Sequence, residues 1–429
     1  MKRFLVCLAV VTVFLLCAVV PWQQIAAPLL RPKLVIAAAP ENEVRALWVV
    51  RDTLTSPESI TAMIGRAKTA KFNTLIVQVR GRGDAYYNSR WEPRTPLLAD
   101  QIPEFDPLEF TIKEAHAAGL KVHAWLNTFL VADLGNVPED PNHVINKHPE
   151  WLAVPRGIAS DVFHGDTTTP TYLERIISYS RANNSELEGL FLSPAHPGVK
   201  EHIYNLWIDI VERYDVDGLH FDYIRYPNRQ YDFSRTSLER FRAEVDKTLR
   251  LEDRQRLNAA FLSNPLAYVN EFPDRYEQFQ RDQVTDLVER IYQGVKIRKP
   301  DALVSAAVFA NDKDAFDARR QDWKQWLQRG ILDVACPMAY STETSVFQRQ
   351  INIAVNSRYQ KNIWAGIGSW QQPVNGTLEK ISAARELGAQ GFVLFSYDSA
   401  VKSSELNPNA DYLNRVRDAL DTAEMKANR

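Results

Sequence analysis

Eight short apolar runs, separated by stretches of helical periodicity, constrain the fold of this chain more than any other feature. Each run has the length of a β-strand, and each spacer is long enough to hold a crossover helix. Eight strands that alternate with helices predict an α/β fold, a (β/α)8 TIM barrel. The runs lie at residues 44–50, 73–80, 120–127, 217–224, 302–310, 332–340, 362–368 and 391–398.

The spacers carry start and stop signals of helices. Ser56 stands immediately before Pro57, in the order of an N-cap followed by the first helical residue. Gly119 and Gly388 follow two other helical stretches, at the position where glycine ends a helix. A doubly wound open sheet is the alternative fold. No Gly-rich phosphate loop follows the first strand, however, where a Rossmann fold carries one.

Two spacers are longer than a single helix requires. Residues 128–216 contain a loop rich in Pro, Asn and His before a helix near 199–213, and residues 228–300 have the pattern of extra helices. They follow the third and fourth strands, and in a barrel the loops after the strands carry the active site. We therefore expect two long insertions at this face, which could form the walls of a cleft.

The N-terminus has the form of an export signal. A basic start precedes an uninterrupted apolar run at residues 4–20, which is long for a signal peptide and short for a spanning helix. We expect residues 1–39 to be a signal peptide or an N-terminal membrane anchor, with residues 4–20 as a tether to the inner membrane. The protein is then exported and works in the periplasm or outside the cell. The (β/α)8 barrel at 40–408 and a helical tail at 409–429 complete the expected division.

Composition and motifs exclude several classes of function. A formal net charge of −2 argues against a globally basic nucleic-acid binder. Cys336 is the only cysteine after residue 17, and the chain has no HExxH motif, His/Cys cluster or Asp-rich calcium loop. We therefore expect no metal and no cofactor. An isomerase or lyase would need a metal or phosphate site that the sequence does not show.

The fourth strand, "DGLHFDYIRYP" at residues 217–227, places ionisable groups opposite an apolar face. Leu219, Phe221 and Tyr223 alternate with the two ionisable residues, so we expect them to pack under the helices of the barrel. His220 and Asp222 are then expected to point into its mouth.

A carboxylate amid aromatic residues and hydrogen-bond donors fits glycoside hydrolysis, which usually needs two carboxylates. Asp222 is the first candidate for catalysis. Asp84 after the second strand, Glu343 after the sixth and Asp52 after the first are the candidates for the second.

Other polar and aromatic side chains near the expected strand ends are candidates for binding substrate. Polar groups on the inward faces of neighbouring strands cost desolvation energy unless they are paired or functional. Arg225 could hold Asp222 ionised or contact a sugar or lactyl carboxylate, and a surface ion pair fits it as well. The aromatic candidates suit sugar stacking or core packing. The set is Gln78, Arg80, Trp125, Asn127, His220, Arg225, Tyr340, Trp370 and Tyr397.

Three segments resemble the glycosyl-hydrolase-like family 10, which is distinct from the family 10 xylanases. They are "NTLIVQVRGRGDAYYNSRWEP", "AGLKVHAWLN" and "YDVDGLHFDYIRYP", and the similarity extends through "PMAYS" and "GFVLFSY" over nearly all of the chain after residue 43. The resemblance implies an exported bacterial barrel that acts on a cell-wall glycan, and some relatives cleave peptidoglycan strands stripped of their peptides. It supports as site residues Gln78, Arg80, Asp84, Asn127, His220 and Asp222. The chain departs from the family in lacking a lipobox, because Cys17 follows Leu16.

The fourth strand also looks like the DGxDxDxE signature of chitinase-type barrels. Asp217 and Asp222 match its first and last aspartates, but Ile224 stands where its general-acid Glu would be. The strand resembles the nucleophile strand DGxRxD of amylase-type barrels as well, which favours Asp222 as a nucleophile. Three readings stay open: Asp222 is an acid or a nucleophile with a partner from another loop, or the protein binds glycan without cleaving it.

Overall fold

The computed structural model describes residues 36–183, 187–356 and 362–427. The apolar run at 4–20, with the expected signal or membrane tether, lies outside these residues. Within the described part of the chain, no helix combines the length and the apolar character needed to cross a membrane.

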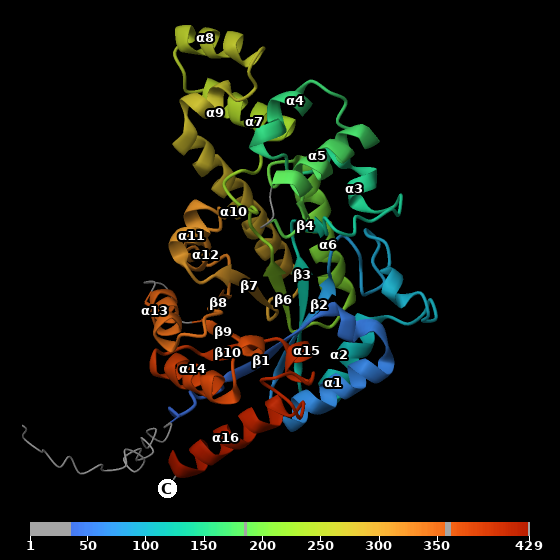
Figure 1. Ribbon diagram of the computed structural model, residues 1–429, viewed down its shortest axis with the longest axis vertical. Helices are drawn as coiled ribbons and strands as arrows, with labels where there is room; N and C mark the ends of the chain where they lie inside the picture. The colour runs from blue at the N-terminus through green and yellow to red at the C-terminus, as the bar shows by residue number, and fades with distance from the viewer. Residues whose placement is uncertain (1–35, 184–186, 357–361, 428–429) are drawn as a thin grey trace, which may run out of the picture. The chain divides into compact units, whose positions relative to one another are not determined.

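Eight parallel strands close into a barrel, in the spatial order β1, β10, β9, β8, β7, β6, β3, β2 and back to β1 (Figure 1). Each strand falls within one of the eight apolar runs, so the predicted (β/α)8 barrel is confirmed and the open sheet is excluded. The strands are β1 Val44–Val49, β2 Thr74–Arg80, β3 Lys121–Asn127, β6 Gly218–Asp222, β7 Leu303–Phe309, β8 Val334–Met338, β9 Trp364–Gly368 and β10 Gly391–Phe395.

Helices connect the strands and cover the outside of the barrel. The longer connecting helices are α1 Pro57–Thr69, α2 Pro107–Ala117, α6 Pro197–Arg213, α10 Pro273–Arg298, α13 Thr344–Val355 and α14 Val374–Glu386. Short helices are η1 Arg51–Thr55, η2 Pro96–Leu98, α11 Asp312–Asp317, α12 Trp323–Gln328, η5 Ser369–Gln371 and α15 Tyr397–Ala400. The last helix, α16 Tyr412–Ala427, packs against α14, where the hydroxyls of Tyr412 and Thr377 are 2.7 Å apart.

The expected helix signals are present. The Ser56 side chain accepts the backbone N–H of Ser59 at 3.2 Å, which caps α1. Gly119 and Gly388 follow α2 and α14 with φ angles of +78° and +88°. Glycine adopts this left-handed conformation without the cost that a Cβ imposes.

Both long insertions are present, and their helices gather in the upper part of Figure 1. The first forms a small antiparallel sheet of β4 Leu130–Ala132 and β5 Leu190–Phe191. Its helices are α3 Val144–Lys147, η3 Pro149–Trp151, η4 Arg156–Ile158, α4 Ala159–Phe163 and α5 Pro170–Asn183. The second insertion contributes α7 Arg235–Asp246, α8 Leu251–Phe261 and α9 Ala267–Glu271 before α10.

Apolar packing occurs on both sides of the barrel wall. Leu219 and Phe221 of β6 are fully buried in the outer cluster between strands and helices, and Phe221 packs on Trp207 of α6 with ring centroids 3.9 Å apart. A smaller cluster fills the interior, with Trp48, Trp125 and residues of most of the other barrel strands. Because aromatic side chains close the interior, the space at the carboxyl ends of the strands is a cavity with a floor and not a pore.

Candidate active site

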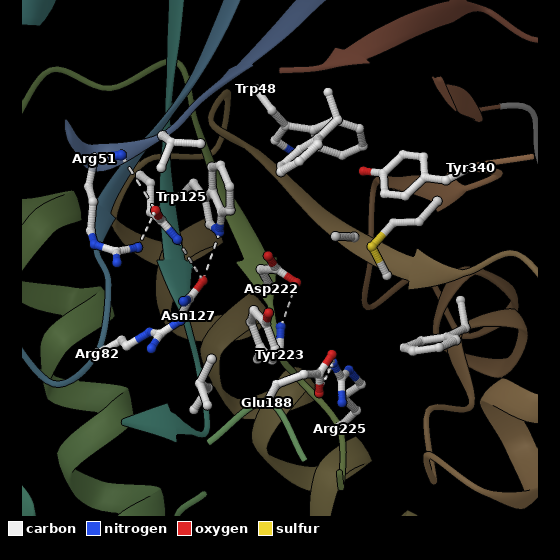
Figure 2. A pocket seen from close by; sticks show the side chains of 17 residues that line it. Trp48, Arg51, Arg82, Trp125, Asn127, Glu188, Asp222, Tyr223, Arg225 and Tyr340 are labelled. Atoms are coloured by element: carbon white, nitrogen blue, oxygen red, sulfur yellow. Dashed lines mark hydrogen bonds and ion pairs between the residues drawn. The ribbon is translucent and has the colours of Figure 1, made fainter. Parts of the chain in front are cut away.

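A cavity of about 430 Å³ opens at the carboxyl ends of the barrel strands (Figure 2). Barrel enzymes carry their active sites at this end. Six of the residues predicted from the sequence line it together: Gln78, Trp125, Asn127, Asp222, Arg225 and Tyr340. The other lining residues are Trp48, Val50, Arg51, Arg82, Leu130, Glu188, Tyr223, Ala307, Phe309, Met338 and Phe395.

Asp222, the last residue of β6, lies in the middle of this cavity (Figure 2). Burial raises the pKa of its carboxyl to about 6. The backbone N–H of Tyr223, which donates to Oδ1 at 2.7 Å, and the charge of Arg225 lower this pKa, whereas the charge of Glu188 raises it. A carboxyl with a pKa near 6 is partly protonated near neutral pH, so it can donate a proton as a general acid.

Tyr223 leaves the strand in an uncommon backbone conformation. Its φ of +49° lies in the left-handed region, which is unfavourable for a side chain of this size. We expected Tyr223 to pack under the helices with Leu219 and Phe221; it packs against the apolar cluster that contains them, but it also lines the cavity. The strict alternation of a strand ends at Asp222, because the chain turns there and redirects the next side chain. Such strain often marks a functional site.

The second carboxylate of the cavity is Glu188, from the first insertion. Arg225 Nη2 donates to both of its oxygens, at 2.9 and 3.0 Å. The guanidinium of Arg225 also lies over the ring of Tyr223, 4.7 Å from its centroid. Sequence reasoning missed Glu188, since it lies in a long loop at no recognisable motif. Its only signal was its position just before a short strand in an insertion expected at the active face.

None of the three carboxylates proposed as partners of Asp222 lines the cavity. Asp84 turns back into its own loop, where its Oδ1 accepts the backbone N–H of Arg82 at 2.8 Å. Glu343 is exposed at the start of α13, and Asp52 is exposed in η1. The second carboxylate that lines the cavity is Glu188 instead. Likewise, only the first of the two insertions contributes residues to the cavity wall.

One wall of the cavity is a chain of polar side chains. Arg51 Nη1 donates to Gln78 Oε1 at 3.1 Å, and Gln78 Nε2 donates to Asn127 Oδ1 at 3.1 Å. The same Asn127 oxygen accepts the indole N–H of Trp125 at 3.0 Å, while its Nδ2 donates to the carbonyl of Gly81 at 2.7 Å. Each member orients the next, so the wall presents fixed donors to a ligand.

The facing wall is aromatic. Tyr340 packs against Trp48 and Phe395, with ring centroids 6.2 and 5.6 Å away. Trp370 does not line the cavity, but its ring lies 5.0 Å from that of Tyr340, so it supports the wall from outside. Tyr397 is buried elsewhere, with its hydroxyl accepting from Arg66 at 3.2 Å, and it takes no part in the cavity.

Two predicted substrate-binding residues do not line the cavity and have structural partners instead. Arg80 is 1% exposed, because its guanidinium forms a buried ion pair with Glu92 at 2.6 Å and donates to the carbonyl of Thr128 at 3.1 Å. His220 is fully buried, between the indole N–H of Trp48 at 3.0 Å and the hydroxyl of Ser305 at 2.8 Å. Burial lowers the pKa of His220 well below its ordinary value, so the imidazole is neutral.

Ile224, which stands where the chitinase-type signature has its general acid, does not line the cavity. It is fully buried in the outer apolar cluster, so a carboxylate at this position would not face the cavity. The general acid of the chitinase-type signature therefore has no counterpart at this point of the chain.

A closed (β/α)8 barrel with two carboxyl groups in the cavity at its strand ends is an arrangement that is typical of glycoside hydrolases. The family model described as glycosyl hydrolase-like 10 matches residues 43–369. The chain belongs to this family, as the sequence resemblance indicated.

Curated relatives agree with this assignment. Glycosyl hydrolase YngK of Bacillus subtilis is 22% identical over 350 residues, which are 71% of this chain and 55% of YngK. Glycosyl hydrolase DigH of Escherichia coli K12 is 24% identical over 295 residues, 62% of this chain and 54% of DigH. The chain thus spans about half the length of the curated relatives it matches.

Solved structures share the fold. The glycoside hydrolase domain of PgaB (BpsB) from Bordetella bronchiseptica has a TM-score of 0.59 at 15% identity, with 87% of this chain and 99% of that domain covered. The GH42 β-galactosidase Gan42B from G. stearothermophilus has a TM-score of 0.57 at 14% identity, with 90% of this chain and 57% of that one covered.

Proposed function

We propose that this barrel hydrolyses glycosidic bonds in a bacterial cell-wall glycan, peptidoglycan or a related N-acetylated polysaccharide, with Asp222 as the central catalytic residue. The observation that carries the proposal is the carboxyl of Asp222, whose pKa is raised to about 6 inside a cavity at the strand ends. Family membership and the relatives named as glycosyl hydrolases support the reaction class. The cell-wall substrate rests on the resemblance of the strand motifs.

In the proposed reaction, protonated Asp222 donates its proton to the oxygen of the leaving sugar as the glycosidic bond breaks. Water must then supply the hydroxyl group for the anomeric carbon that has lost the leaving sugar. Most glycosidases use a second carboxylate at that carbon, either as a base that deprotonates the attacking water or as a nucleophile whose glycosyl ester is later hydrolysed by water. Glu188 is the candidate, since its charge already acts on Asp222 across the cavity. The polar wall of Gln78 and Asn127 would bind hydroxyl or acetamido groups, and the wall around Tyr340 would take the apolar face of a sugar ring.

A nucleophilic role for Asp222, which the amylase-type motif favours, fits the site less well. A nucleophile must be ionised, and burial raises the pKa of Asp222 to about 6, so that a protonated fraction persists near neutral pH. An acid must be protonated, which the same burial promotes. The raised pKa therefore favours the acid role.

The test measures new reducing ends released from purified cell-wall glycan by the full-length protein. Loss of a general acid costs about 100- to 10,000-fold in rate, so Asp222→Asn should lower release by at least about 100-fold. Asp301→Asn, the same change at an exposed site, should leave release unchanged. Undiminished release by Asp222→Asn would refute the assignment.

A non-catalytic glycan-binding protein is the other outcome of this test. It predicts that the wild-type protein sediments with insoluble cell walls but generates no reducing ends on long incubation.

We also propose that the protein works outside the cytoplasm, because its N-terminal sequence has the form of an export signal. Fractionation of cells that express the full chain tests this point.

A further inference from the structure

Arg51 is a cation held in the wall of the cavity. It directly follows β1 and Val50, and its backbone N–H and its Nη1 both donate to Gln78 Oε1, at 3.4 and 3.1 Å. Within the described ranges, Nε and Nη2 have no hydrogen-bond acceptor and the guanidinium forms no ion pair. The side chain is thus anchored through one nitrogen, and its other donors stay available.

The other two arginines of the cavity differ in this respect. Arg225 is neutralised by Glu188, and Arg82 forms an ion pair with Asp133. Arg51 is therefore the lining cation that has no carboxylate partner among the residues the structure describes. Figure 2 places Arg51 and Arg82 on one side of the cavity and Tyr340 on the other, with Asp222 between them.

The chain makes room for the Arg51 side chain at one glycine. A Cβ on Gly81 would lie 2.5 Å from Arg51 Cδ and 2.8 Å from Nε, closer than atoms can pack. The Asp84 carboxylate lies near the same point, with Oδ1 3.1 Å from that Cβ position, but it accepts the backbone N–H of Arg82 and forms no ion pair with Arg51. Gly81 therefore permits Arg51 to reach the cavity.

We propose that Arg51 binds a carboxylate carried by the substrate, so that the site selects an acidic glycan. This inference rests on the proposed function and names its substrate class. A guanidinium with free donors recognises a carboxylate through two parallel hydrogen bonds, and partial enclosure strengthens them. With Arg51 and Tyr340 on opposite sides of Asp222, a sugar ring on the aromatic wall can extend an acidic substituent to the guanidinium.

Two kinds of glycan carry such a carboxylate. One has the lactyl carboxylate of a muramyl residue that carries no peptide, and the other has the carboxylate of a uronic acid. Arg225, which we considered for this contact from the sequence, is already bound to Glu188. We therefore assign the contact with the substrate carboxylate to Arg51 instead of Arg225.

The test compares wild type and Arg51→Gln on polymers with free carboxylates and on the same polymers after amidation. Peptide-free peptidoglycan strands and a uronic-acid polysaccharide form separate arms, so the preferred source is identified. On the preferred free polymer, Arg51→Gln should lower kcat/KM by at least about 10-fold, mainly through KM. Amidation should lower the wild-type value similarly and should hardly affect the variant. Arg254→Gln, at an exposed position on α8, is the matched control.

Calorimetric binding of short oligosaccharides with free or amidated carboxylates separates this inference from the proposed function. Preferential binding of the free form that Arg51→Gln abolishes supports the inference even if no polymer is cleaved. Equal binding and cleavage of free and amidated forms by wild type would overturn it, and the proposed hydrolysis would still stand.

Gly81→Ala gives a second, independent variant. The added methyl must displace the Arg51 side chain, so we expect the same loss of preference for the free carboxylate. An unchanged preference in a folded Gly81→Ala protein contradicts the proposed placement of Arg51.

Discussion

Replacing Asp222 by Asn should stabilise the protein while it removes activity. The carboxyl has a pKa of about 6 in the folded protein and an ordinary value of 3.8. Because the folded value is the higher one, the folded state binds the proton more tightly than the unfolded state. Stability is therefore lost as pH rises from about 4 to about 6, when the folded protein must hold an unfavourable charge.

The size of this effect follows from the two pKa values. One pKa unit corresponds to about 1.36 kcal/mol, so ionised Asp222 destabilises the fold by about 3 kcal/mol above pH 7. Asn has nearly the same shape, can accept the backbone N–H of Tyr223 and carries no charge. The variant should thus gain about 1 to 3 kcal/mol near pH 8 and almost nothing near pH 3.5, where Asp222 is protonated in the folded state and mostly protonated in the unfolded state.

Urea unfolding followed by tryptophan fluorescence measures this difference, since the chain has ten tryptophans. With an m value of about 3 kcal/mol/M, the midpoint of Asp222→Asn should rise by up to about 1 M near pH 8. Exposed Asp301→Asn should leave the midpoint unchanged at both pH values. An Asp222→Asn protein that is no more stable than wild type near pH 8 would refute the reasoning about burial.

Three further outcomes are expected. Glu188→Gln should lower the rate, because Glu188 is the proposed second carboxylate, and should move the falling limb of the remaining pH–rate profile to lower pH, because the charge of Glu188 raises the pKa of Asp222. Arg80→Ala should cost about 3 to 5 kcal/mol in unfolding free energy, since it leaves the buried Glu92 carboxylate with only the imidazole of His202, at 3.2 Å, as an ionisable partner. His220→Leu should cost about 1 to 3 kcal/mol, because the indole N–H above it loses its acceptor.

A specific result would contradict each of these three predictions. A falling limb that stays in place or moves upward in Glu188→Gln would remove Glu188 from the electrostatics of the site. If Arg80→Ala kept wild-type stability but bound substrate more weakly, Arg80 would be a substrate-binding residue, as the sequence predicted. A fully stable His220→Leu protein with altered pH dependence would indicate a chemical role for the imidazole.

The barrel could be predicted from the sequence because its signals are local and repeated. Short apolar runs, an N-cap at Ser56 and glycines at Gly119 and Gly388 each specify one strand or one helix end. The closed topology then follows from their number and order. Asp222 could be found in the same way, because strand alternation shows which residues of β6 face inward.

The other residues of the site are brought together by contacts between distant segments of the chain. Such contacts leave no periodic pattern in the sequence. Glu188 enters the cavity through a loop, and its partner Arg225 is 37 residues further along the chain. Arg80 and His220 were assigned to the correct strands, but their structural roles depend on contacts with Glu92 and Trp48, which strand periodicity does not reveal. Tyr223 departs from the expected face because its backbone turns into the left-handed region.

The central claim, that Asp222 donates the proton to the leaving sugar, is tested most directly by the leaving group itself. Wild type and Asp222→Asn are compared on a natural glycan oligomer and on the matching aryl glycoside with a dinitrophenolate leaving group, which departs without protonation. The proposal predicts a loss of at least about 100-fold on the oligomer and little loss of the bond-breaking step on the aryl glycoside. An equally large loss on both substrates would contradict it and would assign Asp222 to nucleophilic attack.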